Sequence, residues 1–421
     1  TATTNTAVAQ FSDTLLRLTD LNVLRFVSDS SLAEGVPTTP VDLHTILKQL
    51  STKFHDVLEP YELDECSAYA QGRELIEDMI FHPERTINLS DEERDRYRIA
   101  EREISEATED AVEIMFRVRR PAIICMTTAG LLNATDRGGI FKGRLTGCRV
   151  VIGDEASQIP EPAFVAIAAR FPDARHIYIG DVNQLDPHVR CSRNSKAAQL
   201  GARGIMDILL RKNVPLAPLL TTFRAHPALN ELPSQLFYDG TLISGTAPDE
   251  RRLLLDAINL PNPDIPFLFV DVAGESIRST NGSHFNEAEL QACRDLVQGL
   301  LAKGLPSASL SVIAFYREQY RKLEDYAQRL NIAIYTVDSV QGRETDIVIL
   351  LTTRTDIQLN QGDFIDDRLR MNVALTRSKH GLFVLGKAKA LEHLPHWSRL
   401  LQWADNHGVI ATTTTLADLL L

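Results

Sequence analysis

The chain contains 421 residues, 44% of them hydrophobic and 24% charged, and it carries a formal net charge of −12. This length suits roughly two or three domains of about 100 to 200 residues each, and the composition excludes a disordered protein. No stretch of about 18 apolar residues is present, which excludes a membrane-spanning protein.

The five cysteines are scattered, and none has the CxxC or Cys/His spacing of a structural zinc site. The odd number and irregular spacing also argue against a disulfide framework, so we expect a reducing compartment, cytoplasmic or nuclear. The negative net charge argues against a protein that coats nucleic acid by bulk attraction. A local basic groove on an acidic body is still compatible with it.

Residues 32–120 are predicted to be mainly helical. Ser90 and Glu93 have the spacing of a capping box, and Pro121 ends the pattern that follows them. Apolar side chains recur between these points at alternating steps of three and four residues, as in a heptad seam. They are Tyr97, Ala100, Ile104, Ala107, Ala111, Ile114 and Val118. The pattern predicts a long helix packed on a neighbour, with an arm that binds a partner protein or nucleic acid as the alternative.

Short apolar runs rich in Val and Ile recur along the rest of the chain, with helical stretches between them. They begin at Ala122, Cys148, His176, Phe267, Ser311, Ile332, Asp346 and Leu382. Runs that are apolar throughout are typical of parallel strands covered on both faces, so we predict an α/β architecture with parallel sheets. The runs fall into two groups, which predicts two lobes with a boundary near Asn213.

An acidic pair ends one of these runs. The segment VVIGDEASQ places Asp154 and Glu155 directly after a predicted strand, and the carboxyl ends of parallel strands are where open α/β sheets bind ligands. Phosphoryl transfer uses such a pair, one carboxylate for the coordination shell of Mg²⁺ and the other to orient or deprotonate the attacking water. Acidic residues also often begin ordinary loops, so the pair alone is a weak signal.

The next run ends in another polar turn. In HIYIGDVNQLDP, Gln184 follows Asp181 by three residues, and its amide can both donate and accept a hydrogen bond. Such a group can sense whether a γ-phosphate is present, and an ordinary polar turn is the plainer interpretation. The two segments together favour a phosphate-binding edge.

Five segments in order carry a resemblance to a known family. They are DEASQ, GDVNQLDP, TTFRAHPALNELPSQLFYDGTL, TVDSVQGRETDIVIL and RMNVALTRSKHGLFVLG. These segments resemble motifs II to VI of superfamily 1 helicases, and more narrowly of the RNA-surveillance (nonsense-mediated decay) group of superfamily 1B. Near the N-terminus, ATTNTAVAQ resembles motif Ia, and CMTTAG resembles motif Ib. One departure is FYRE at residues 315–318, which replaces the more usual proline-tyrosine motif.

The resemblance implies two RecA-like parallel-sheet lobes with a helical insertion in the first lobe. The first lobe would comprise residues 1–31 and 121–213, the insertion residues 32–120, and the second lobe residues 214–421. In this group the insertion packs over the nucleic acid, and it is also where we expect protein cofactors to bind.

The resemblance also implies a nucleotide site with ATP and Mg²⁺ as cofactors. Asp154 resembles the aspartate of the Mg²⁺ shell, Glu155 the glutamate that activates water, and Gln184 the γ-phosphate sensor. Arg224 and Arg377 resemble two arginine fingers of the second lobe. A planar guanidinium can meet two of the equatorial oxygens over which the transition-state charge spreads.

Further positions resemble contacts to the nucleotide and to nucleic acid. Gly342 resembles a backbone position near the γ-phosphate, and Glu344 resembles a ribose contact. Phe223 stands where a Tyr commonly stacks on adenine, with packing in the core as the alternative. The implied nucleic-acid contacts are Thr4, Asn5, Thr127, Thr128, Thr336 and Ser339. Hydroxyl groups suit binding to the backbone of a strand without regard to its sequence.

The phosphate-binding loop GxxxxGK[ST] is absent from the printed sequence, where the only Gly-Lys pair, Gly386-Lys387, is followed by Ala388. The first residue is Thr1 rather than Met, and it begins at motif Ia. We therefore expect that the physiological polypeptide is longer at its N-terminus, and that this chain alone lacks ATPase activity.

The sequence thus predicts a fragment of an ATP-dependent helicase or translocase that moves 5′ to 3′ on single-stranded RNA, with DNA as the other substrate. A non-catalytic nucleic-acid-binding scaffold with the same fold is the alternative. An ATPase that remodels protein complexes would share the motifs up to the nucleic-acid contacts. Suitable residues occupy every catalytic position that would follow the phosphate-binding loop, which favours the enzyme over the non-catalytic scaffold.

Overall fold

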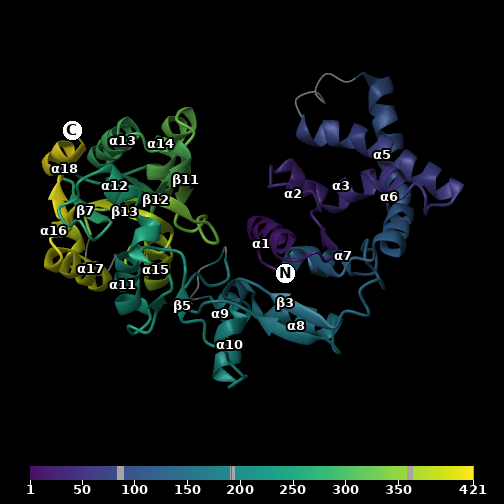
Figure 1. Ribbon diagram of the computed structural model, residues 1–421, viewed down its shortest axis with the longest axis horizontal. Coiled ribbons are helices and arrows are strands. Elements are labelled where there is room, and N and C mark those ends of the chain that lie inside the picture. The colour runs from purple at the N-terminus through teal and green to yellow at the C-terminus, as the bar shows by residue number, and fades with distance from the viewer. Residues whose placement is uncertain (83–89, 190, 192–194, 358–363, 421) are drawn as a thin grey trace. The chain divides into compact units, whose positions relative to one another are not determined.

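The chain forms two compact units (Figure 1). The computed structural model describes residues 1–82, 90–189, 191, 195–357 and 364–420. Unit 1 comprises Thr1–Asp181 and Pro187–Lys212, and unit 2 comprises Val182–Asp186 and Asn213–Leu421. No helix among the described residues is long and apolar enough to cross a membrane.

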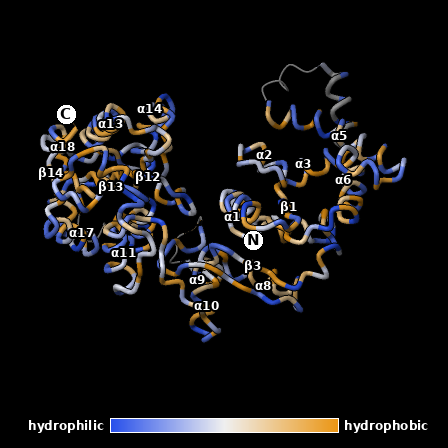
Figure 2. Tube along the Cα trace, viewed as in Figure 1, coloured by the Kyte–Doolittle hydropathy of each residue, from blue (hydrophilic) through white to orange (hydrophobic). Residues whose placement is uncertain are grey.

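A six-stranded parallel sheet forms the centre of unit 2, in the order β11-β10-β12-β13-β7-β14. The strands are β7 (Phe267–Asp271), β10 (Leu310–Ala314), β11 (Ala333–Thr336), β12 (Thr345–Leu351), β13 (Ser378–Gly386) and β14 (Ile410–Thr412). The interior strands are apolar along most of their length, as the orange tube at β12 and β13 shows (Figure 2). The prediction of an α/β architecture with a parallel sheet is confirmed.

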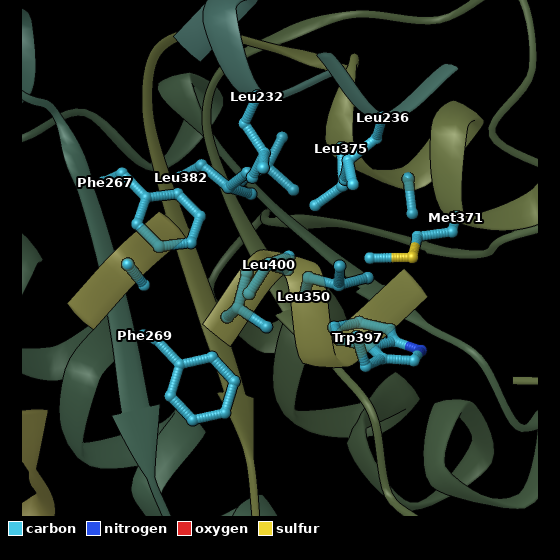
Figure 3. Packing of buried hydrophobic residues seen from close by; sticks show 14 of the residues in the cluster. Leu232, Leu236, Phe267, Phe269, Leu350, Met371, Leu375, Leu382, Trp397 and Leu400 are labelled. Carbon is cyan, nitrogen blue, oxygen red and sulfur yellow. The ribbon is translucent and has the colours of Figure 1, made fainter. Parts of the chain in front are cut away.

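Helices cover both faces of this sheet. They are α11 (Pro227–Phe237), α12 (Leu253–Ala257), α13 (Glu287–Ala302), α14 (Arg317–Arg329), α15 (Arg368–Leu375), α16 (Ala388–Leu391), α17 (Pro395–Asn406) and α18 (Thr413–Leu420). In β7, Phe267 and Phe269 pack with α11, α15 and α17, where Trp397 is fully buried (Figure 3). Leu268 and Val270 of the same strand pack with α13, α14 and α18. This alternation follows from the two-residue period of a strand.

Two short sheets complete unit 2. They are β5 (Thr221–Thr222) with β6 (Ile243–Ser244), and β8 (Ile277–Arg278) with β9 (His284–Phe285). The first pair is parallel and the second is antiparallel.

Unit 1 contains two separate parallel pairs of strands among its described residues. β1 (Val23–Arg25) pairs with β2 (Ile123–Cys125), and β3 (Val150–Gly153) pairs with β4 (Arg175–Tyr178). The helices that surround them, apart from those between β1 and β2, are α1 (Asn5–Leu18), α7 (Thr128–Ala134), α8 (Glu161–Arg170), α9 (Lys196–Gly201) and α10 (Ile205–Arg211).

The backbone of Thr1 and Ala2 links the two pairs of strands. The α-ammonium group of Thr1 donates to the carbonyl of Ile152, and the carbonyl of Thr1 accepts the N–H of Asp154 at 2.7 Å. Ala2 forms a parallel bridge on its other side, where its carbonyl accepts the N–H of Thr128 at 2.8 Å. These two residues therefore occupy one rung of a parallel ladder between the ends of β2 and β3.

The helical segment between β1 and β2 contains the predicted long helix. Its helices are α2 (Asp29–Ala33), α3 (Leu43–Lys48), α4 (Leu50–Lys53), α5 (Pro60–Phe81) and α6 (Asp91–Arg119). Helix α6 starts directly after Ser90, and its seam residues Ile104, Ala111 and Ile114 are buried in the core that α5 also lines. The side chains of the predicted seam residues Tyr97 and Ala100 lie outside the described part of the chain.

One carboxyl group is enclosed in unit 2. Glu289 of α13 is fully buried and accepts the backbone N–H groups of Thr352 and Thr353 at 2.7 and 3.0 Å, and the side-chain amide of Gln319 at 3.1 Å. It thereby ties α13 to the residues after β12 and to α14. Burial raises the pKa of Glu289 to about 8, although the hydrogen bonds from Thr352 and Thr353 act in the opposite direction.

The buried carboxyl of Glu289 predicts a pH dependence of stability. With a pKa raised from 4.5 to about 8, the folded unit keeps a proton that the unfolded chain releases. The stabilisation from this bound proton is fully present below the pKa that Glu289 has in the unfolded chain. It is lost as the pH rises through the pKa of Glu289 in the folded unit. As the pH rises from about 5 to 8, we expect the free energy of unfolding of Glu289→Gln to increase relative to that of the wild type, by on the order of a few kcal/mol. Urea unfolding followed by tryptophan fluorescence measures this in unit 2 alone, because the chain's two tryptophans are Trp397 and Trp403.

Glu287→Gln is the matched control, because Glu287 lies on the same helix with its side chain 56% exposed. It should leave the pH dependence of the wild type unchanged. A constant difference between Glu289→Gln and wild type over this pH range would contradict the prediction.

Candidate functional site

The DEASQ segment forms the turn that follows β3. Asp154 is held by its N–H bond to Thr1, and Ala156 donates its N–H to the carbonyl of Ile179 after β4 at 2.8 Å. Glu155 has a φ of 51° in the left-handed region, which non-glycine residues seldom adopt. It precedes the short 3-10 helix η2 (Ala156–Gln158). Backbone bonds to Thr1 and to Ile179 therefore fix the turn that carries the two carboxylates at the carboxyl edge of β3.

A glycine lets the turn after β4 approach this segment. A Cβ on Gly180 would lie 2.8 Å from the backbone nitrogen of Ser157 and 2.9 Å from that of Ala156. No other residue could take this place without moving the backbone. The structure thus brings the DEASQ segment and the start of the GDVNQLDP segment together, as two adjacent strand ends should be.

The residues that resemble motifs Ia and Ib lie beside the same turn. The hydroxyl of Thr3 donates to the side-chain oxygen of Gln158 at 2.9 Å. Thr4 caps α1 and Thr127 caps α7, each accepting a backbone N–H from the first turn of its helix. Thr128 is buried, and its hydroxyl donates to the carbonyl of Ala2 at 3.2 Å. Of these predicted nucleic-acid contacts, Thr128 therefore serves the internal packing of unit 1.

The predicted sensor Gln184 belongs to unit 2, although the sequence placed it in the first lobe. Its turn, Val182–Asp186, is held by Asn372 of α15, whose amide donates to the carbonyl of Asn183 at 2.7 Å. Leu185 packs against the core of unit 2. The eight residues between β4 and Pro187 therefore pass from one unit to the other and back, which hydropathy alone does not indicate.

An ion-pair cluster joins three motifs in unit 2. Arg224 donates to Glu344 at 2.7 Å, across 120 positions of sequence, and Lys379 pairs with the other oxygen of Glu344 at 3.0 Å. Arg224 also donates to the carbonyl of Thr376 at 3.0 Å. Burial acts to raise the pKa of Glu344, but the bonds to Arg224 and Lys379 prevail and lower it. The carboxylate is thus ionised between two cations.

Arg377 lies next to this cluster and is only 2% exposed. Its guanidinium donates to the carbonyl of Val373 at 2.9 Å, to the hydroxyl of Thr376 at 2.8 Å and to the carbonyl of Arg343 at 3.4 Å. Glu344 and Arg377 directly precede the paired residues of β12 and β13, so they meet at the amino ends of these strands. Through its bonds to Arg343 and Val373, Arg377 links the segment before β12 to α15.

Two other predicted nucleotide contacts have distinct environments. Gly342 has a φ of 75°, a conformation that favours glycine. Phe223 is 68% exposed, which excludes the alternative that it packs in the core. Its ring lies over Gly245, where a Cβ would stand 2.4 Å from the nearest ring carbon. The exposed face of this ring is suited to stacking.

Several side chains of this site were not predicted from the sequence. Lys379 shares Glu344 with Arg224, Thr376 receives bonds from both arginines, and Asn372 holds the turn of Gln184. Lys379 and Thr376 flank Arg377 closely in sequence, so the proximity to motif VI was the available signal. The role of Asn372 depends on a tertiary contact that spans 189 positions.

The chemistry of the donors fits ATP with Mg²⁺. Asp154 and Glu155 supply hard oxygen ligands, and Mg²⁺ in phosphate sites is usually held by one or two carboxylates together with the phosphates and water. The described residues contain no cluster of three or more His, Cys, Asp or Glu side chains arranged for a metal. In unit 2, Arg224, Arg377 and Lys379 outnumber the single carboxylate of Glu344, which favours an anionic ligand.

Comparisons with known proteins agree with the motif pattern. A family model described as an AAA domain matches residues 202–389. A regulator of nonsense transcripts 1 homolog from Arabidopsis thaliana is 29% identical over 96% of this chain and 30% of that protein. The 5′-3′ DNA helicase ZGRF1 from Mus musculus is 33% identical over 61% of this chain and 14% of that protein. The chain therefore spans less than a third of the length of these curated relatives.

A solved structure, an arterivirus nonstructural protein 10 (helicase) in complex with DNA, is 17% identical with a TM-score of 0.30. The match covers 58% of this chain and 41% of that chain.

The burial of Arg377 predicts that it stabilises unit 2. Replacing it with Ala leaves the carbonyls of Val373 and Arg343 without their charged donor, so we expect Arg377→Ala to lower the free energy of unfolding by about 2–4 kcal/mol. Arg224→Ala removes an ion pair whose side chains are 32% and 31% exposed, and it should cost less than about 1 kcal/mol. Urea unfolding followed by tryptophan fluorescence compares the two variants. Equal stabilities would show that the buried bonds of Arg377 contribute nothing net.

Proposed function

Since the chain is similar, over nearly its whole length, to superfamily 1 helicases of the nonsense-mediated decay group, we propose that it forms the motor part of an ATP-dependent helicase or translocase. The observation that carries the proposal is the cluster of Arg224, Glu344 and Arg377. It gathers residues of three separate motifs at adjacent strand ends, with an excess of positive charge. A packing role alone would not require charged residues from three distant segments to meet.

In the proposed reaction, Asp154 would hold Mg²⁺ and Glu155 would orient and deprotonate the attacking water. When bound, Mg²⁺ neutralises the negative charge of the phosphates. Gln184 would respond to the γ-phosphate. Arg224 and Arg377 would stabilise the charge that develops on the transferred group. Because Glu344 holds Arg224 at 2.7 Å, Arg224 would have to exchange this carboxylate for a phosphate oxygen.

The proposed track is a single strand, moved 5′ to 3′. RNA is favoured by the similarity to regulators of nonsense transcripts, whereas the mouse relative is named a DNA helicase. Thr4, Asn5 and Thr127 would contact the backbone of the strand from unit 1, and Thr336 and Ser339 from unit 2. We propose a cytoplasmic or nuclear location, and protein cofactors that bind the helical segment of residues 32–120.

The proposal also needs a phosphate-binding loop, which the printed sequence does not contain. Val150, Ile152, Ile177 and Ile179 on one face of the β3–β4 pair are 41–49% exposed. A helix packed on this face would cover them. We propose that the helix following a phosphate-binding loop packs on this face.

One observation favours the alternative, a nucleic-acid-binding scaffold without hydrolysis. The guanidinium of Arg377 donates to groups of its own unit and is buried, so it does not present a free finger to a phosphate. A scaffold would keep the nucleic-acid contacts at Thr336 and Ser339 and would not depend on Glu155.

Substitution of Glu155 tests the hypothesis that the protein hydrolyses ATP. In a polypeptide extended upstream of Thr1 to include a GK[ST] loop, we expect Glu155→Gln to lower RNA-stimulated ATP hydrolysis by about 10²–10⁴-fold, because the amide cannot take a proton from water. Binding of RNA should be unchanged. Phosphate release and fluorescence anisotropy measure the two quantities.

Asp173→Asn is the control, because Asp173 is an exposed carboxylate before β4, at the opposite end of this strand. It should retain full turnover. Full turnover by Glu155→Gln would overturn the role of Glu155, and an extended polypeptide that binds RNA without any hydrolysis would support the scaffold.

A further inference from the structure

A cavity of about 770 Å³ lies in unit 2, at the carboxyl ends of β10 and β11. This volume is within the range of about 300–1,000 Å³ that is typical of sites for small ligands. Phe315 and Tyr316 line it after β10, and Thr336 lines it at the end of β11. Ser339, Arg343 and Phe364 are also among the lining residues. Arg224 and Phe223, on which the proposed nucleotide site depends, are not among its lining residues.

The aromatic rings of this cavity are held in place by their neighbours. Tyr316 and Phe364 lie with ring centroids 5.3 Å apart at an interplanar angle of 48°. The guanidinium of Arg343 lies 4.9 Å from the ring centroid of Tyr335 and donates to its hydroxyl at 3.3 Å. Arg370 lies 4.4 Å from the centroid of Phe364. Rings that are fixed before binding lose little conformational entropy when a planar ligand stacks on them.

The polar lining favours an anion beside the planar ligand. Arg317 and Arg343 both line the cavity, and the single acidic residue there, Asp338, is paired with Arg370 at 2.9 Å. Arg317 also begins α14, a helix of 13 residues whose N-terminus is the positive end of its dipole. The hydroxyls of Thr336 and Ser339 lie at the same edge, 3.1 Å apart. Aromatic faces, guanidinium groups and hydroxyls together match a base joined to a phosphate.

We propose that this cavity receives one base of the bound single strand, turned out of the stack of its neighbours. The phosphates beside that base would lie at Thr336 and Ser339, and the base would stack on the wall of Tyr335 and Phe364. The inference rests on the proposed function, since it presumes that a single strand binds unit 2. It adds a contact to a base where the motif residues imply contacts to the backbone only.

An abasic scan tests this inference on the 421-residue chain. Fluorescence anisotropy measures the affinity for the shortest single-stranded RNA that binds fully, and for copies in which one residue at a time lacks its base; the same series is made in DNA. We expect the loss of one particular base to weaken binding by about 5- to 150-fold, as stacking of one base on an aromatic side chain implies. In Tyr335→Ala and Phe364→Ala, the same abasic change should have much less effect.

Tyr326→Ala is the matched control, because Tyr326 is a half-buried tyrosine of α14 that does not line the cavity. It should keep the base dependence of the wild type, and tryptophan fluorescence verifies that each variant is folded. If the strand binds but no single abasic position weakens its affinity, this inference is overturned and the proposed function is left intact. If neither RNA nor DNA binds, both are overturned.

Two further outcomes would also overturn the inference. A base dependence that persists in both cavity variants would place the base elsewhere. Free AMP or UMP that removes the base dependence without displacing the strand would assign the cavity to a mononucleotide.

Discussion

In unit 1, one apolar core packs against both pairs of strands, and these pairs are bridged by the backbone of Thr1 and Ala2. Their backbone groups bond to the end of β3 on one side and to the start of α7 on the other. The turn that carries Asp154 and Glu155 therefore lies beside the starts of α1 and α7. Two-stranded sheets are marginal by themselves, because each leaves a row of backbone groups unpaired. The position of the candidate catalytic pair is thus set by contacts outside its own strands.

Unit 2 is organised in the opposite way, around a sheet with its own complete core. Its buried charged groups link separate segments by hydrogen bonds. Glu289 accepts N–H groups from two segments, and Arg377 donates to oxygens of three residues. Each such group costs free energy unless its partners are present. The charged residues that the motifs single out can therefore stabilise the fold and contact a ligand at once, and the exposure of each side chain decides between these roles in the structure described.

The sequence predicted much of the fold, since the strands β2, β3 and β4 and most of the sheet of unit 2 follow from runs of Val and Ile. The three-residue strand β1 escaped prediction because Arg25 interrupts its apolar pattern. This arginine is buried with partners for its charge, an ion pair with Asp42 at 3.1 Å and hydrogen bonds to backbone carbonyls. The unit to which Gln184 belongs and the burial of Arg377 depend on tertiary contacts. Periodicity reports which face of an element is apolar, but it does not report which distant carbonyl a guanidinium meets.

The segment of residues 337–344 connects the two candidate sites of unit 2. It leaves β11 at the carboxyl edge of the sheet, beside Thr336 and Ser339, and it enters β12 at the amino edge, beside Glu344. Within it, Arg343 directs its side chain to Tyr335 in the cavity, while its carbonyl accepts a bond from Arg377. Arg343 therefore lies at both sites, with its backbone against the arginine cluster and its side chain in the wall of the cavity.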